Sequence, residues 1–167
     1  MYRSPPGTEN LISRASELAR AFSSGFEAIT RMPEFAEYLC DLPSAARREL
    51  ERELLAYTAY TLSATLLAGG YLGELAELEQ FMESFVEATG RWDDELYGRV
   101  DLYRRLDAER GEVVGAASAL RFARFAAAAI GATDAEGGEA TLLLTELANV
   151  FLLNYINPVL ARIFSHP

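Results

Sequence analysis

The chain has 167 residues, of which 50% are hydrophobic and 24% are charged, and its formal net charge is −10. This composition excludes a disordered chain, and the length suits one domain that buries about 70% of its unfolded surface. All fifteen basic residues are arginine, so no lysine is present to form a Schiff base, and the acidic balance argues against nucleic acid as a partner.

Proline and glycine divide the sequence into segments of helical periodicity, and no convincing alternating strand is present. We expect a flexible tail over residues 1–7 and one helical domain over residues 8–167. The expected helices span residues 8–32, 33–42, 44–68, 73–89, 91–110, 112–130 and 139–164, the last passing Pro158. The fold prediction is therefore all-α: a single-domain bundle of six or seven helices, with a charge-poor central helix and an apolar C-terminal helix.

The charge-poor central segment, residues 56–73, reads AYTAYTLSATLLAGGYLG. Aligned threonines and central tyrosines are poor lipid-facing chemistry, which disfavours a membrane span. A threonine can return its hydroxyl hydrogen bond to the preceding turn, so a buried core helix is the favoured interpretation. A pocket for a small ligand, lined by hydroxyl-bearing side chains, is the alternative. Its candidate residues are Tyr57, Thr58, Thr61 and Thr65.

Two later helices each carry a short polar pattern in apolar surroundings. Arg121 and Arg124 are three residues apart and share a helix face, and Glu146 and Asn149 do the same on the last helix. These side chains are either solvent-facing edges or one internal Arg–Glu pair, or they converge on a water-excluded site for an anionic or amide-bearing ligand. The ligand-site hypothesis adds all four residues to the candidate list.

Catalytic patterns are scarce in the sequence. The single histidine, His166, is next to the C-terminal residue, which is a poor position for the base of a nucleophilic triad. The strongest carboxylate pattern is Glu74 and Glu77, whose E-x-x-E spacing can hold Mg²⁺ in helical nucleotide hydrolases. The next helix lacks the matching E-x-x-D motif. We therefore expect no cofactor, and a binding protein rather than an enzyme.

Three functions follow from these patterns, in order of preference. The first is a cytoplasmic helical interaction or regulatory protein that forms a homodimer and binds neither nucleic acid nor membrane. Its expected interface is on the last helix, at Phe151, Leu152, Tyr155 and Ile156. The second is a carrier or sensor of a small apolar ligand held between residues 56–68 and 140–157. The third is a Mg²⁺-dependent hydrolase of nucleotides that uses Glu74 and Glu77.

Overall fold

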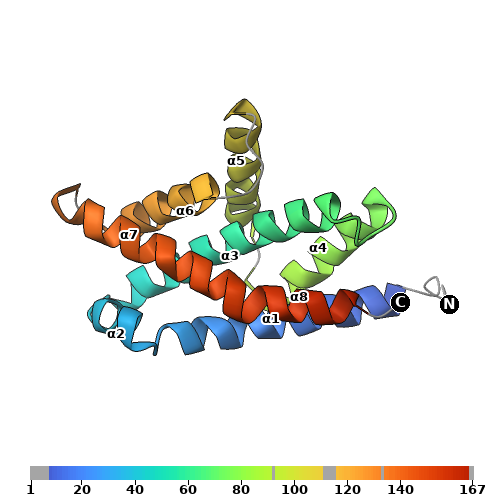
Figure 1. Cartoon of the computed structure of the whole chain (residues 1–167), viewed down its shortest axis with the longest axis horizontal. Coiled ribbons are helices and arrows are strands. Elements are labelled where there is room, and N and C mark those ends of the chain that lie inside the picture. Colours follow the sequence, from blue (N-terminus) through green and yellow to red (C-terminus); the bar gives the residue numbers. More distant parts are fainter. Residues whose placement is uncertain (1–7, 92, 111–115, 133, 166–167) are drawn as a thin grey trace.

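The computed structural model describes residues 8–91, 93–110, 116–132 and 134–165, so the predicted tail and His166 lie outside the described residues. Within these ranges the chain is all-α, and its last three segments form one continuous helix (Figure 1). The helices are α1 (Thr8–Ile29), α2 (Pro33–Cys40), α3 (Ser44–Ala68), α4 (Leu75–Thr89), α5 (Asp94–Arg110), α6 (Ala116–Ala129), α7 (Asp134–Phe151), the π segment η1 (Leu152–Ile156) and α8 (Asn157–Phe164). Counted with α7, η1 and α8 as one, the described helices number seven, which confirms the predicted fold class.

The central helix of the bundle is α3, which packs against α4, α5 and α6. Residues 53–60 are all buried, and such all-round burial explains why this part of the helix has no polar face. Thr58 Oγ1 donates to the carbonyl oxygen of Leu54 at 2.7 Å, so its hydroxyl is satisfied within the helix as expected. The prediction of a charge-poor central helix is confirmed.

Helix α5 crosses α3 steeply and projects from the body of the bundle (Figure 1). Asp93 caps its first turn by accepting a hydrogen bond from the backbone N–H of Leu96 at 2.9 Å. Arg52 of α3 also contacts this end of the helix, with Nη2 3.0 Å from Asp93 Oδ2 and 3.2 Å from Glu95 Oε2. These exposed ion pairs contribute little stability individually, so buried contacts must hold α5 to α3.

The C-terminal helix continues past Pro158 through the π turn of η1. A proline within a helix cannot donate its backbone hydrogen bond, and a π turn inserts one extra residue into the helical register. Phe151 and Ile156 both point into the core, five residues apart, because η1 lies between them. The sequence pattern predicts the continuous helix but not this change of register.

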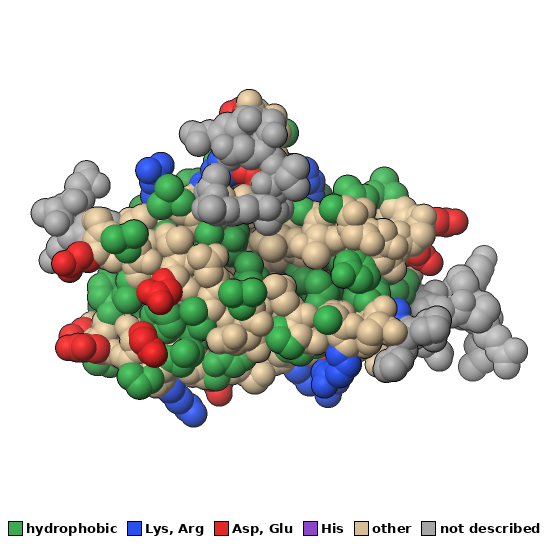
Figure 2. Space-filling model, viewed as in Figure 1, with side chains coloured by type: hydrophobic (Ala, Val, Ile, Leu, Met, Phe, Trp, Pro, Cys, Tyr) green, Lys and Arg blue, Asp and Glu red, His purple; other side chains and the backbone are tan. Residues whose placement is uncertain are grey.

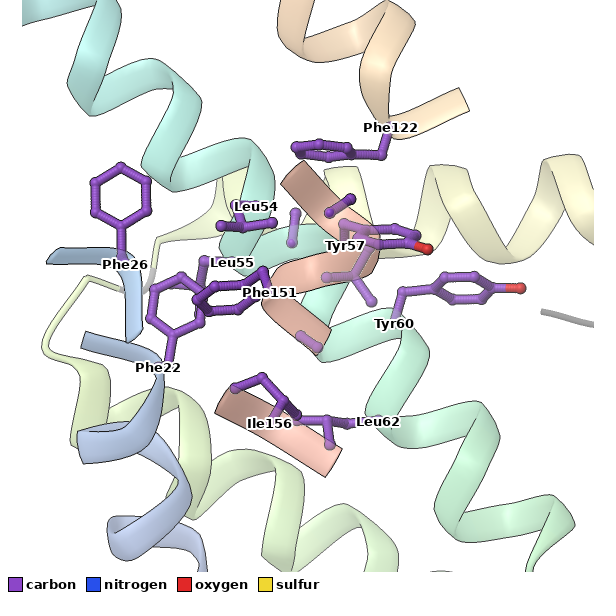
Figure 3. Packing of buried hydrophobic residues seen from close by; sticks show 14 of the residues in the cluster. Phe22, Phe26, Leu54, Leu55, Tyr57, Tyr60, Leu62, Phe122, Phe151 and Ile156 are labelled. Carbon is purple, nitrogen blue, oxygen red and sulfur yellow. The ribbon is translucent and has the colours of Figure 1, made fainter. Parts of the chain in front are cut away.

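Helix α1 packs closely against α4 and against the π segment. A Cβ atom placed on Gly25 would lie 2.7 Å from Tyr155 Cβ, so only glycine allows the two helices to approach this closely. Phe22 of α1 meets Phe151 edge to face, with ring centroids 5.4 Å apart. Figure 3 shows these two rings beside Leu55 of α3, where three helices meet in the core.

One of the described helices is long and apolar enough, by length and composition, to cross a membrane. It spans Gly138–Phe164, and 39% of its most apolar window is buried inside the bundle. The remainder is half-buried or exposed, and Figure 2 shows mainly hydrophobic and uncharged atoms over α7 and α8. The large hydrophobic side chains exposed there are Leu142 and Leu153, at 72% and 64%. This surface, rather than residues 56–73, is the apolar feature that needs an explanation.

Candidate functional site

Asp107 of α5 is the centre of a buried polar cluster. It is 3% exposed and accepts hydrogen bonds from three side chains on two other helices. Tyr60 of α3 donates its phenol to Oδ2, Ser118 of α6 donates to the same oxygen at 2.9 Å, and Arg121 of α6 donates to Oδ1. The carboxylate of Asp107 thus connects α5 with both α3 and α6.

A second buried carboxylate, Glu53 of α3, lies across the same helix junction. It is 4% exposed, and its Oε1 accepts a hydrogen bond from the phenol of Tyr103 at 2.7 Å. The guanidinium of Arg99, one turn away on α5, lies 3.6 Å from Oε2. Glu53 therefore has one hydrogen-bond donor and one looser cationic neighbour, whereas Asp107 has three donors.

The two carboxylates are connected by stacked tyrosines. Tyr60 of α3 donates to an acid of α5, and Tyr103 of α5 donates to an acid of α3, so the arrangement is reciprocal. The two rings are nearly parallel, with centroids 5.6 Å apart and an interplanar angle of 14°. Tyr57 extends the stack toward Phe122 of α6, at 5.2 Å between centroids, and Figure 3 shows Phe122 above the Tyr57 ring.

The different surroundings of the two acids shift their pKa values in opposite directions. Burial raises the pKa of Glu53, and the hydrogen bond from Tyr103 and the charge of Arg99 offset this only in part. Burial acts to raise the pKa of Asp107 too, but hydrogen bonds from Tyr60, Arg121 and Ser118 outweigh it and hold that pKa below 3.8. Burial, with the adjacent carboxylates, also raises the pKa of Tyr60 and Tyr103, so both phenols remain donors.

This cluster satisfies its own polar groups. Among the described residues, no buried side-chain nitrogen or oxygen lacks a hydrogen-bond partner. An adjoining surface recess has room for about one water molecule, and its lining residues are Glu49, Arg52, Glu53, Glu95, Leu96 and Arg99. The geometry therefore indicates that the cluster holds α3, α5 and α6 together.

The predicted ligand residues do not converge. Arg121 is buried and its carboxylate partner among the described residues is Asp107, whereas Arg124, Glu146 and Asn149 are all exposed. An internal Arg–Glu pair with Glu146 was one expectation. Arg121 does form an internal ion pair, but its acid is Asp107. Helix α6 presents Arg121 toward α5, and α7 presents Glu146 toward solvent.

Three of the four predicted hydroxyl-bearing residues of α3, namely Tyr57, Thr58 and Thr61, have structural partners. Tyr57 belongs to the aromatic stack and is 2% exposed. Thr61 Oγ1 donates to the Tyr57 carbonyl oxygen at 2.8 Å, in the same manner as Thr58. Thr65 is half-buried near the end of the helix. The threonine hydroxyls at 58 and 61 are therefore directed to the helix backbone and not to a shared pocket.

The Glu74 and Glu77 pair lies at the start of α4. Glu77 Oε2 accepts hydrogen bonds from the backbone N–H groups of Gly73 and Glu74, at 2.9 and 3.3 Å. This is the usual role of a glutamate at the third position of a helix. No group of three or more Asp, Glu, His or Cys side chains able to hold a metal occurs in the part of the chain that the structure describes.

The four residues predicted for the dimer interface occupy different environments. Phe151 and Ile156 are inside the core, at 0% and 1% exposure, and Leu152 and Tyr155 are half-buried against it. The outer side of the same helix is formed by other residues: Leu142 and Asn149 of α7 and Leu153 of η1 are exposed. Of the four predicted residues, only Leu152 and Tyr155 are therefore partly accessible to a partner.

Four members of the cluster were not predicted from the sequence: Asp107, Glu53, Tyr103 and Ser118. A signal for two of them was present. Asp107 continues the buried series Leu96, Val100 and Tyr103 at helical spacing, as the only acid in an apolar stripe. Glu53 likewise lies one turn after the buried Leu50. An acid in line with core residues is the pattern that identifies a buried carboxylate.

No protein-family model matches this chain, and neither does any curated protein or solved structure. The described residues offer two distinctive features: an interior cluster with satisfied polar groups and an apolar C-terminal helix.

The raised pKa of Glu53 predicts a specific pH dependence of stability. The folded state binds the carboxyl proton of Glu53 more tightly than the unfolded state does. The stabilisation from protonated Glu53 is therefore complete below pH 4.5 and is lost as pH rises through the pKa of the folded state. We expect Glu53→Gln to gain stability relative to the wild type as pH rises from 4.5 to 8, since glutamine stays neutral. Urea unfolding at several pH values measures this, with the exposed Glu83→Gln as control. A constant difference between Glu53→Gln and the wild type would contradict it.

Proposed function

We propose that the chain is a helical interaction protein that associates with itself through the outer face of its C-terminal helix. The observation that carries the proposal is the exposure of Leu142 and Leu153, at 72% and 64%, on a helix whose opposite side is packed into the core. Two leucines eleven residues apart on one face of a helix are a typical contact pair for another helix. A partner helix would remove both from water.

The polar residues on this face favour a protein partner over lipid. Glu146 and Asn149 are exposed between the two leucines, and carboxylate and amide groups are costly in hydrocarbon unless they are paired. In a protein interface the same groups can form hydrogen bonds across the contact. The opposite side of the helix, with Leu144, Leu147 and Phe151, is already occupied by the core.

The interior supports binding rather than catalysis as the mode of action. Asp107 already has three hydrogen-bond donors, and Glu53 is held by Tyr103. Glu77 is engaged by backbone N–H groups. A general acid or base must be free to meet a substrate within hydrogen-bond reach, and these carboxylates are committed to holding helices. The surface is the part of this molecule that can engage a partner.

Analytical ultracentrifugation at tens of micromolar tests the proposal. We expect the wild type to sediment above its monomer mass of 18.4 kDa, and the double variant Leu142→Glu/Leu153→Glu to sediment as a monomer at the same concentration. Burying two carboxylates in place of two leucines removes the apolar contact and adds a desolvation cost. The matched control is Leu67→Glu, because Leu67 is 67% exposed on α3 and lies outside this face. It should leave association unchanged.

Two results would overturn the proposal. One is a wild-type chain that remains at 18.4 kDa over the whole concentration range. The other is flotation of the wild type, but not of Leu142→Glu/Leu153→Glu, with phosphatidylcholine vesicles. That result would assign the apolar face to a membrane surface instead of a second protein chain.

A further inference from the structure

The outward residues of the C-terminal helix form a regular seam. We define the outer seam as the exposed positions that follow one another at intervals of three or four residues along its outer side. Its members are Glu139, Leu142, Glu146, Asn149, Leu153 and Asn157. From Glu139 to Leu153 the intervals are three, four, three and four, which is the spacing of the contact positions in a coiled coil.

The π turn of η1 brings Asn157, in place of Ile156, into the outer seam. A heptad pattern would place Ile156 after Leu153 on the outer side. The extra residue of η1 turns Ile156 into the core, at 1% exposure, and Asn157 outward. The helix therefore keeps one side in its own core and one side in the solvent over its whole length.

The outer seam is complementary to itself when two copies run in opposite directions. With the twofold axis between Glu146 and Asn149, each Leu142 faces the Leu153 of the other copy. Each Glu146 then faces an Asn149, whose amide can donate to the carboxylate. Apolar residues thus meet apolar residues, and each acid meets a neutral donor.

A parallel arrangement is chemically poorer. It places each seam residue against its own copy, so that Glu146 faces Glu146 and Glu139 faces Glu139. Like charges in direct opposition disfavour a contact, and charged positions of this kind set the orientation of helix pairs. The helix dipoles also oppose each other favourably only in the antiparallel arrangement.

From these observations we infer that the partner of the outer seam is a second copy of this chain, paired antiparallel with Leu142 against Leu153 and Glu146 against Asn149. The inference rests on the proposed function and adds the orientation and register of the contact. An antiparallel pair with a twofold axis closes on itself, so it yields a dimer and not a filament.

Disulfide trapping tests the register in a Cys40→Ser background, which removes the exposed native thiol. We expect an oxidised mixture of Leu142→Cys and Leu153→Cys chains to form a covalent dimer that contains one chain of each kind. Either variant alone should remain uncrosslinked. Two copies of the same residue would be about 16 Å apart along an antiparallel pair, whereas a disulfide needs Cβ atoms about 4 Å apart.

A charge substitution gives an independent readout. Asn149→Arg places a guanidinium opposite Glu146 of the other copy in the antiparallel register, and we expect association to tighten roughly tenfold at low salt. In a parallel pair the same substitution would oppose two arginines and weaken association.

The control for the disulfide trapping is Leu75→Cys, an exposed position on α4. It should form a disulfide with neither Leu142→Cys nor Leu153→Cys.

The outcomes separate the inference from the proposed function. Self-linking of Leu142→Cys together with weaker association of Asn149→Arg would overturn the antiparallel register while the dimer itself stands. A wild-type dimer that traps at neither position would place the contact on another face and would also overturn the inference. A wild-type monomer would overturn the proposed function itself.

Discussion

Asp107→Ala is expected to lower the free energy of unfolding by about 3–5 kcal/mol, the usual effect of removing one partner from a buried ion pair. The substitution removes the acceptor that Tyr60, Ser118 and Arg121 share. Ser118 is fully buried and Tyr60 is 6% exposed, so neither hydroxyl gains free access to water. Urea unfolding followed by circular dichroism, at one fixed protein concentration, measures the change.

The matched control for this substitution is Asp101→Ala on the same helix. Asp101 pairs with Arg104 and Arg105 at the surface, where such pairs contribute about 0–1 kcal/mol. The effect of Asp107→Ala should also shrink in acid. Because the pKa of Asp107 is lowered, its stabilising effect is present above pH 3.8 and is lost as pH falls through the folded pKa. Equal losses for the two variants would show that Asp107 is not the centre of the cluster.

The fold could be predicted because its main signals are local. Proline and glycine mark the helix boundaries, and the lack of charge between Ala56 and Gly73 identifies the central helix before any packing is known. The continuous C-terminal helix through Pro158 was predicted in the same way. Helix periodicity depends on residues within one or two turns of each other, and their spacing can be read from the sequence.

The buried cluster could not be predicted because it depends on how helices cross. Arg121 could be identified as an unusual charge in an apolar helix, but its partner Asp107 is fourteen residues earlier and on another helix. Glu146 was an equally good partner by sequence. Which acid meets Arg121 depends on the relative placement of the helices, and that placement is set by side-chain packing across the whole bundle.

The inward position of Ile156 could not be predicted for a different reason. Extending the periodicity of α7 into residues 151–156 requires an unbroken α-helical register, and the π turn adds one residue there. Phe151 and Ile156 therefore face the core together. A change of register of one residue moves side chains by about 100° around a helix, which is enough to exchange a core position for a surface one.

Phe151→Ala tests whether the Phe151 side chain faces the core. We expect this substitution to lower the free energy of unfolding by about 3–5 kcal/mol. Phe151 is fully buried, and its ring contacts Phe22 at 5.4 Å and Tyr155 at 5.9 Å between centroids. Truncation removes these contacts and leaves a cavity where α1, α3 and the C-terminal helix meet. Thermal and urea unfolding measure the loss, at a concentration below the range of self-association so that only the monomer is compared.

The control for this truncation is Leu67→Ala, which removes an exposed leucine of α3 and should change stability by about 0.5 kcal/mol or less. An interface position would behave in the opposite way to a core position. It would leave the unfolding of the monomer unchanged and would weaken association at higher concentration. If Phe151→Ala gave that result, the side chain would lie in the dimer contact, and the outward register of Leu142, Asn149 and Leu153 would be wrong.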